Sequence, residues 1–535
     1  MLTLMLLTIL VPFLGAVIIY FFKNRTLNRS IFFIQGIETG LVIYLIRRFL
    51  IYGPYHFVIG GWQQQIGIEL GIDRLTVLFM LLTLILWWAS IFYMWPQRHS
   101  DVKHLFFMLV LEGMFMGFLQ SRDLFNMFLF IEVITMISTI LITYQKNGTS
   151  VKAGIYYLLF NNLGMLIFLL GVILVYIATG TLNMYQLDSL MSSVKGQSIM
   201  QLAYVFFVTA MGVKAAFFPV YNWLPTAHAA APSHISALLS GLLVKSGIYG
   251  FMRITDMFGY EMFNTYFLWV GIITSIGGVC FAMVQKDIKL ILGYHTISQV
   301  GLIFTALSVP DYLAQEAGLI HLLNHGIFKG LLFIGAGITA RIYGTRSVDK
   351  IRGVLKKAPI ISIGLIIGSL AITGFPLFNG YAGKHLIMES FKEQHLVYWV
   401  LTFVNLGTMI SFIKLSAIHF GESTMRSSPV VSKFIKISVL VLSLLCITSF
   451  PFLRVSSINQ WTLSSLAYIP HTIMVDIIKY FLMMEIGYGV YIGIIRKDPK
   501  LIKAMRSFNL SFENSNLMLM FFIFTMIVFG TQLIL

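Results

Sequence analysis

Apolar runs near twenty residues long recur from Leu2 to Leu535, and they constrain the fold of this chain more than any other feature. A helix of about twenty residues crosses a hydrocarbon core of roughly 30 Å. Hydrophobic residues make up 58% of the chain and charged residues 11%, which is too apolar for a soluble domain. We therefore expect an all-α polytopic membrane protein with about fourteen core helices and about two more near the C-terminus. The first run, Leu2 to Phe22, lacks a small-residue cleavage site and is interpreted as the first membrane helix.

Basic residues gather in the connections between the apolar runs and give a formal net charge of +16. They crowd alternate connections, which include Lys286, Lys289 and the clusters at 341–357 and 496–506. Because cytoplasmic loops are rich in lysine and arginine, this bias predicts a multi-pass cell (inner) membrane protein with its N-terminus outside. A charge spread over short loops does not indicate a nucleic-acid partner.

Lysines also occur inside the apolar runs, whereas we assign the arginines to the connections. A buried lysine can lose its proton, while arginine stays charged at any working pH. Ionisable residues at membrane depth mark ion paths by default, so this choice of cation favours a proton path. The lysines within runs are Lys214, Lys245, Lys329, Lys384, Lys414 and Lys479.

One carboxylate, Glu132, lies about midway along an otherwise apolar run that follows Asp123. An ionised and unpaired carboxylate is costly in lipid, so it pairs with a lysine or stays protonated. The alternative interpretation is an ion pair that only orients two helices.

The segment from Gly212 to Lys245 combines a lysine with two prolines. Pro219 and Pro225 are expected to break the helix after Lys214, which at membrane depth requires freed carbonyls to face protein or water. Lys245 then lies deep in the following run. A proline kink that serves packing alone remains the alternative. Two further titratable residues occur in this segment, His228 and His234.

The segment from His321 to Lys329 places His321, His325 and Lys329 at intervals of four residues, on one helical face. Two histidines four apart can bind zinc, but no carboxylate or thiolate accompanies them and the HExxH pattern is absent. Cys280 and Cys446 lie in separate apolar runs. We therefore expect neither a metal site nor a bound cofactor.

A second interrupted helix is expected where Gly374 and Pro376 precede Lys384. Two interrupted helices in corresponding halves of a chain are typical of inverted repeats with an ion path between them. The spacing predicts four parts: N-terminal helices at 1–103, a first repeat at 104–255, a second repeat at 262–419, and C-terminal helices with an extension at 420–535.

Other polar residues within runs carry weaker predictions. Glu112, His295 and Lys414 extend the proton path or serve as local structural partners. The run containing Asp476, Lys479 and Glu485 is either an amphipathic surface helix or a helix that packs on a partner subunit.

Four ordered segments resemble the proton-pumping membrane subunits of respiratory complex I and the related Mrp-type cation/proton antiporters: Lys214 to Lys245, Asp287 to Gly301, His321 to Lys329, and Gly374 to Lys384. The resemblance covers roughly residues 70 to 420. It implies a core of about fourteen helices with two inverted repeats of about five helices and discontinuous helices 7 and 12.

The resemblance also implies roles for single residues. Glu132 resembles the family's helix-five glutamate, Lys214 its helix-seven lysine and Lys245 its central helix-eight residue. His321, His325 and Lys329 resemble the residues of helix eleven that link the halves. Lys384 resembles the helix-twelve residue and is similar to the D-type Mrp subunit, whereas His295 stands where many members carry serine.

Together these features predict a proton-translocating subunit of a multisubunit membrane complex, not itself a redox catalyst. The expected member is the D-type subunit of an Mrp-type Na⁺/H⁺ antiporter or a close relative. The alternative is a redox-driven proton-pumping subunit of a complex I-like NADH dehydrogenase or a membrane-bound hydrogenase. In either case Glu132 and Lys214 are expected to form a charge pair whose separation drives a proton toward Lys384. An enzyme is disfavoured because no nucleotide, metal or catalytic-triad motif occurs, and a scaffold would not need lysines in the membrane.

Overall fold

The computed structural model describes residues 1–22, 30–96, 101–423, 430–455, 459–508 and 510–532. Within them, 13 helices are long and apolar enough to cross a membrane, which confirms an all-α polytopic membrane protein. Two further apolar helices, Ser198–Lys214 and Pro359–Thr373, are shorter. Each ends shortly before a proline, Pro219 or Pro376, and so does not reach full length.

The first part of the chain consists of helices and one small hairpin. The strands pair antiparallel, with Tyr55 opposite Ile72. The elements are α1 (Leu2–Phe22), α2 (Ser30–Tyr52), β1 (Tyr55–Val58), β2 (Glu69–Ile72), α3 (Arg74–Met94), α4 (Val102–Gln120), α5 (Leu124–Ile142), α6 (Gly148–Thr179) and α7 (Met184–Val194).

The middle of the chain contains helices that follow one another after short breaks. A π-helical turn at Leu239–Leu243 lies within the stretch that crosses the membrane from Ser233 to Phe258. The helices are α8 (Ser198–Lys214), α9 (Trp223–Ala230), α10 (Ser233–Leu238), α11 (Val244–Phe258), α12 (Asn264–Val284), α13 (Ile288–Leu307) and α14 (Tyr312–Tyr343).

The last part is again helical. A second π-helical turn, Tyr491–Ile495, continues α20. The helices are α15 (Val354–Lys357), α16 (Pro359–Thr373), α17 (Asn379–Ser390), α18 (His395–Ser416), α19 (Lys433–Val455), α20 (Asn459–Val490), α21 (Lys500–Ser507) and α22 (Phe512–Gln532).

Side-chain caps fix where many of these helices begin. A side-chain oxygen of Asp or Asn accepts a hydrogen bond from a backbone N–H of the first turn, which satisfies donors that the helix itself leaves free. The capping residues are Asp73, Asp101, Asp123, Asn147, Asn183, Asp287 and Asp311.

The helix ends gather on two faces of the bundle. On the first, the hairpin face, Glu69 of β2 contacts the connections around Arg122 and Asn183. On the second, the basic face, the segment from Arg341 to Lys357 joins the ends of α9, α12 and α18: Arg346 Nη1 donates to Ala229 O at 2.5 Å, and Gly353 N donates to Phe420 O at 3.0 Å.

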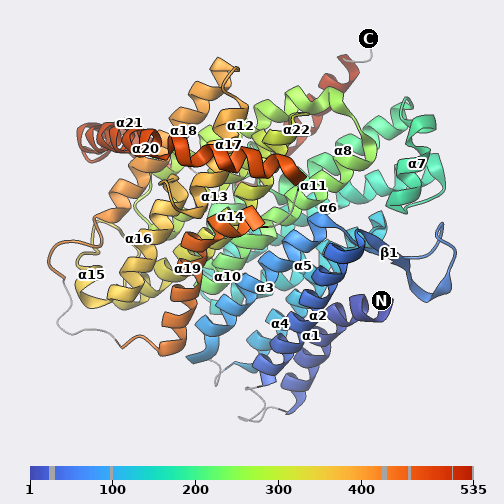
Figure 1. Ribbon diagram of the computed structural model, residues 1–535, viewed down its shortest axis with the longest axis horizontal. Coiled ribbons are helices and arrows are strands. Elements are labelled where there is room, and N and C mark those ends of the chain that lie inside the picture. Colours follow the sequence, from blue (N-terminus) through green and yellow to red (C-terminus); the bar gives the residue numbers. More distant parts are fainter. Residues whose placement is uncertain (23–29, 97–100, 424–429, 456–458, 509, 533–535) are drawn as a thin grey trace.

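The core lies in the helices that the sequence marks as richest in titratable groups. The stretch Ser233–Phe258, α13 and α14 are each 94% buried across their most apolar window, against 33% for α1 and α2. Figure 1 shows α1 and α2 (blue) at one edge of the bundle, α15 and α16 (yellow to orange) at another, and α13 and α14 between them. Polar side chains on these central helices are therefore withdrawn from lipid.

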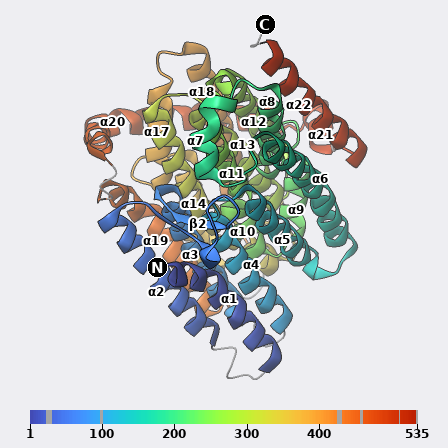
Figure 2. The same ribbon diagram turned by 90° about the vertical axis from the view of Figure 1, so that its right-hand side faces the viewer.

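The C-terminal helices return along the bundle. α20 packs against α18, and α21 lies beside α12. α22 lies beside α8 (Figure 2), where Thr209 Oγ1 donates to Met526 Sδ at 3.6 Å. The residues after α19 thus contact helices that are far apart in the chain, from α8 to α18.

Candidate functional site: a buried file of lysines and histidines

Lys214 occupies the last position of α8 and is 2% exposed. Its Nζ donates a hydrogen bond to Thr135 Oγ1 of α5 at 2.6 Å and lies 5.6 Å from the centre of the Tyr157 ring. Glu132, one turn before Thr135, is close enough for its charge to act on Lys214. The ion pairs of the described residues, however, include none between Glu132 and Lys214. In this structure Lys214 Nζ therefore bonds a hydroxyl of α5 and not the carboxylate that we expected as its partner.

The chain is irregular between Lys214 and the start of α9 at Trp223. Protein groups satisfy the backbone that this break frees: Trp223 Nε1 donates to Val213 O at 2.9 Å, and Phe218 N donates to Thr274 Oγ1 at 2.9 Å. Pro219 lies in the break, but Pro225 lies in the first turn of α9. A first-turn proline leaves the helix intact because its missing N–H has no intrahelical acceptor there.

Lys245 is completely buried at the start of α11. Its Nζ donates to Ser240 O and to Gly241 O, both at 2.9 Å. Both carbonyls belong to the π-helical turn just before it, where the shifted register leaves backbone oxygens for a side chain to use. The π-helical turn therefore stabilises the Lys245 side chain in the core of the helix bundle.

Three residues of α14 continue the series of buried lysines and histidines that begins with Lys214 and Lys245 and ends at Lys384, which we call the file. Lys329 Nζ donates to Leu292 O of α13 at 2.6 Å, and His321 Nε2 lies 2.9 Å from Gln299 Oε1. Both ring nitrogens of His325 are buried and have no hydrogen-bond partner among the described residues, and the same holds for His228 and His295. Buried polar groups of this kind are normally satisfied by ordered water. All three rings lie close enough to Lys329 for its charge to act on them.

Lys384 lies on α17, beyond the connection that Gly374 begins at φ 79° and that contains Pro376. It is 5% exposed, and its Nζ has no hydrogen-bond partner among the described residues. A Cβ added at Gly383 would lie 2.7 Å from the Cα of His321. Glycine thus allows α17 to approach α14 closely, which brings Lys384 beside the histidines.

Two of the weaker candidates lie in other surroundings. Gln35 Nε2 of α2 donates to Glu112 Oε1 at 2.8 Å, near the buried Glu38. Lys414 Nζ donates to Met283 O and Gln285 O, both at 2.6 Å. These carbonyls lie at the C-terminal end of α12, so the contacts of Lys414 are those of a side chain that caps a helix.

A pocket of about 450 Å³ lies at the basic face and includes His104, His234, Lys289 and Arg341 in its lining. The Nε2 atoms of His104 and His234 are 2.7 Å apart, so one ring donates and the other accepts. Lys289, which the charge pattern assigned to a connection, is 5% exposed and donates to Ala231 O at 2.7 Å. His104 was not singled out from the sequence, because a lone histidine at the start of an apolar run carries no signal until its partner is known.

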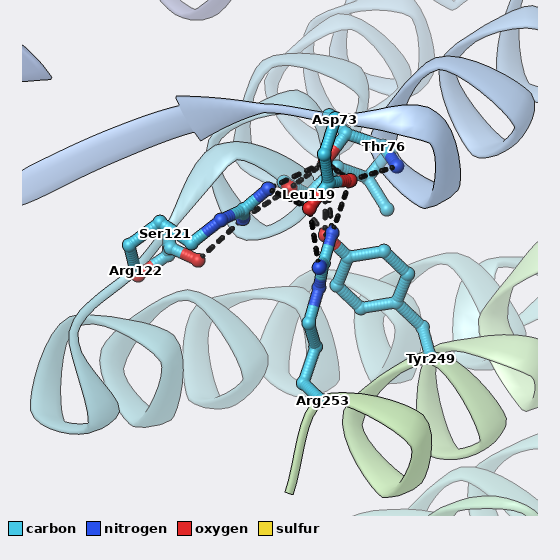
Figure 3. Close-up of polar contacts among 7 residues, drawn as sticks. All are labelled: Asp73, Thr76, Leu119, Ser121, Arg122, Tyr249 and Arg253. Atoms are coloured by element: carbon cyan, nitrogen blue, oxygen red, sulfur yellow. Dashed lines mark hydrogen bonds and ion pairs between the residues drawn. The ribbon is translucent and has the colours of Figure 1, made fainter. Parts of the chain in front are cut away.

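Sequence reasoning also missed an ion cluster at the hairpin face (Figure 3). The carboxylate of Asp73 lies 2.5 Å from Arg253 Nη1 and 3.0 Å from Arg122 Nη2, and Arg253 also donates to Thr76 Oγ1 at 3.0 Å and Tyr249 Oη at 2.9 Å. Burial opposes ionisation of Asp73, but the guanidinium groups of Arg253 and Arg122 outweigh it and hold the pKa of this carboxyl well below its usual range.

The assignment of all arginines to connections is therefore wrong, because Arg253 lies within α11. Two features of the sequence could have indicated this cluster: Asp73 directly precedes one apolar run, and Arg253 lies near the end of another.

One protein family matches more than half of the chain. Residues 121–411 match the family described as "NADH:quinone oxidoreductase/Mrp antiporter, TM". The D-type subunit of a Na⁺/H⁺ antiporter from Alkalihalophilus pseudofirmus is 31% identical over 472 residues, which cover 86% of this chain and 96% of that protein. The N-type subunit of an NADH-quinone oxidoreductase from Desulforudis audaxviator is 29% identical over 375 residues, 68% of this chain and 74% of that protein.

Two solved structures have the same overall arrangement. A chain of the membrane-bound sulfane sulfur reductase, an archaeal respiratory membrane complex, superposes with a TM-score of 0.78 at 26% identity, covering 89% of this chain and 99% of that chain. A chain of the Mrp complex from Dietzia sp. gives a TM-score of 0.76 at 21% identity, covering 94% of this chain and 99% of that chain. The second likeness concerns the fold alone.

Proposed function

Because this chain belongs to the NADH:quinone oxidoreductase/Mrp antiporter membrane family, we propose that it carries protons across the membrane as one subunit of a multisubunit complex. The observation that carries the proposal is the buried file itself. Its four lysines, Lys214, Lys245, Lys329 and Lys384, are each 5% exposed or less. The buried histidines of α14, His321 and His325, lie between Lys245 and Lys329 in the sequence. Lysine and histidine can both exchange protons when buried, and ionisable groups at this depth mark ion paths.

Lys214 is the proposed switch. With Nζ on Thr135, the lysine forms none of the ion pairs described with Glu132. Movement of Nζ to the carboxylate favours the protonated lysine, because an opposite charge stabilises the charged form, and return to Thr135 favours release. The released proton passes to Lys245, then through Lys329, His325 and His321 to Lys384.

The membrane orientation proposed for this path has the N-terminus and the hairpin face outside. The basic face, with Arg341, Arg346 and Lys286, is then cytoplasmic, as the distribution of basic residues in membrane proteins requires. We further propose that 104–255 and 262–419 are inverted repeats. In support, an interrupted helix occurs in each, α8 with α9 in the first and α16 with α17 in the second.

The proposed coupling ion is sodium, as in the D-type member of an Mrp antiporter. Alignment with the Na⁺/H⁺ antiporter relative extends over 86% of this chain, against 68% for the NADH-quinone oxidoreductase relative. Lys384 also resembles the helix-twelve residue of the D-type Mrp subunit. The second candidate is a redox-driven pump, which the likeness to a chain of a respiratory membrane complex at 26% identity supports.

The test uses inverted vesicles that carry the complete complex. Quenching of a ΔpH-sensitive dye is measured with and without sodium, for wild type, for Lys214→Ala and for a matched control, Lys152→Ala, whose side chain is exposed on α6. Sodium-dependent dequenching in wild type and the control, lost in Lys214→Ala, supports antiport through the file. Donor-driven acidification without a sodium response supports the redox pump. Wild-type transport by Lys214→Ala contradicts both.

A further inference from the structure

A cavity of about 240 Å³ lies beside Lys384 and is lined by α17, α18 and α20. Its lining runs from Lys384, which is 5% exposed, to Glu389 and Lys392, whose side chains are 41% and 61% exposed. The cavity therefore connects the last lysine of the file with the end of α17 at the hairpin face. Lys384 Nζ is a buried donor without a partner among the described residues.

The C-terminal helix α20 contributes a carboxylate to this cavity. Asp476 Oδ2 accepts a hydrogen bond from Tyr381 Oη at 2.6 Å and lies 3.1 Å from His385 Nδ1. Its side chain is only 14% exposed, although the neighbouring positions Met474 and Val475 are 72% and 50% exposed. Of the carboxylates that line the cavity, Asp476 is thus the sheltered one, while Glu389 forms an exposed pair with Lys392.

His385 lines the same cavity as Lys384 and Asp476. It follows Lys384 directly on α17, and its ring lies 5.1 Å from the ring of Tyr381. An aspartate beside Nδ1 favours the tautomer with the proton on that nitrogen, which leaves Nε2 free to accept another. The charged groups that face His385 are Asp476 and Lys479 of α20 and Glu389 and Lys392 at the end of α17.

We propose that Asp476 and His385 form the outer end of the proton path. In this exit relay, the carboxylate of α20 takes up the proton that leaves the lysines and histidines of the core. This inference rests on the proposed function. A proton leaves Lys384 Nζ and binds His385 Nε2 through water in the cavity that both residues line. The proton on Nδ1 then passes to Asp476, whose carboxyl releases it to water at the hairpin face. Transfer of the proton that remains on Nε2 to Nδ1 through water in the cavity restores the first tautomer. One proton enters and one leaves, and no bond other than N–H and O–H changes.

A purely structural role makes different predictions. An anchor for α20 needs only an acceptor for Tyr381, which an amide oxygen also provides. Asp476→Asn keeps that acceptor and removes the group that takes a proton, and Asp476→Glu keeps the proton acceptor. The matched control is Glu485→Gln, because Glu485 is an exposed carboxylate on the same helix.

The experiment measures ΔpH-dependent quenching in inverted vesicles that carry the complete complex, with assembly followed by native gel electrophoresis. We expect Asp476→Asn and His385→Gln to reduce the transport rate at least about tenfold, as loss of a proton-transfer group does. Asp476→Glu is expected to recover most of the rate with a shifted pH profile, and Glu485→Gln to equal wild type.

Wild-type transport by Asp476→Asn overturns the exit relay. If Asp476→Asn fails to assemble, His385→Gln decides, and a wild-type rate in that variant overturns the proposal equally. Lys214→Ala, measured in parallel, separates the two hypotheses. Loss of transport in Lys214→Ala with normal transport in Asp476→Asn contradicts only the relay, whereas normal transport in Lys214→Ala contradicts the proton file itself.

Discussion

Lys214 Nζ is bonded to the hydroxyl of Thr135 at 2.6 Å and not to Glu132, three residues earlier on the same helix. The hydroxyl stabilises the lysine in the position away from the carboxylate, so its removal should shift the balance between the two positions. A hydrogen bond to a charged group contributes about 1.5–3 kcal/mol. We therefore expect Thr135→Val to change the transport rate roughly tenfold or more without abolishing it, because Glu132 and Lys214 both remain.

The matched comparison is Thr139→Val on the same helix, since Thr139 Oγ1 donates to the backbone oxygen of Thr135 and to no other acceptor in the part of the chain that the structure describes. Initial rates of ΔpH formation in vesicles, corrected for the amount of complex, give the measurement. Equal rates for Thr135→Val and Thr139→Val would show that the hydroxyl has no part in the switch.

The ion cluster at Asp73 should contribute to stability in a pH-dependent way. Because its folded-state pKa lies below the unfolded value of about 3.9, the stabilisation is fully present above the unfolded pKa. It is lost as the pH falls through the folded pKa. Asp73→Asn leaves Arg253 and Arg122 without their carboxylate, and breaking a buried pair in this way costs about 3 kcal/mol or more.

The measurement is the thermal transition of the detergent-solubilised complex between neutral pH and about pH 3. We expect Asp73→Asn to lower the transition temperature at neutral pH, and the difference from wild type to begin to narrow below about pH 4. Asp188→Asn serves as the control, because Asp188 is exposed on α7 and forms none of the ion pairs described. A constant difference between Asp73→Asn and wild type at all pH values would contradict the linkage.

The membrane class and most of the file could be predicted from the sequence, because both depend on local pattern. The length of the apolar runs predicts the membrane helices. The four-residue spacing of lysine and histidine from His321 to Lys329 predicts that they share one face of α14. Partners that come from distant parts of the chain could not be predicted. Arg253 joins Asp73 across 180 positions, and Asp476 reaches Tyr381 across 95; neither residue has a periodic signal of its own.

The contacts of Lys414 favour the second of the two interpretations that the sequence left open, a local structural partner. Its Nζ caps the carbonyls of Met283 and Gln285 at the end of α12. Lys414→Met should leave these buried oxygens unsatisfied, at about 1–3 kcal/mol, and so lower the thermal transition temperature. Transport per assembled complex should stay near wild type, whereas Lys384→Met should abolish it at little change in stability. Loss of transport in Lys414→Met with an unchanged transition temperature would instead place Lys414 on the path.

The close approach of α17 to α14 at Gly383 provides a steric test of the link between the histidines and Lys384. A Cβ at this position would lie 2.6 Å from the Cβ and 2.7 Å from the Cα of His321, distances that backbone atoms cannot accommodate without movement of a helix. Gly383→Ala should therefore move Lys384 away from His321. The control is Gly489→Ala on α20, where an added Cβ meets nothing within 4 Å.

We expect Gly383→Ala to reduce the transport rate at least about tenfold, because proton transfer falls steeply when donor and acceptor leave hydrogen-bond reach. The control should keep the wild-type rate. Since overpacking typically costs only about 1–3 kcal/mol, the complex should still assemble, so the effect on rate can be measured separately from stability. An assembled Gly383→Ala complex that transports at the wild-type rate would mean that protons reach Lys384 by a route that does not depend on its distance from His321.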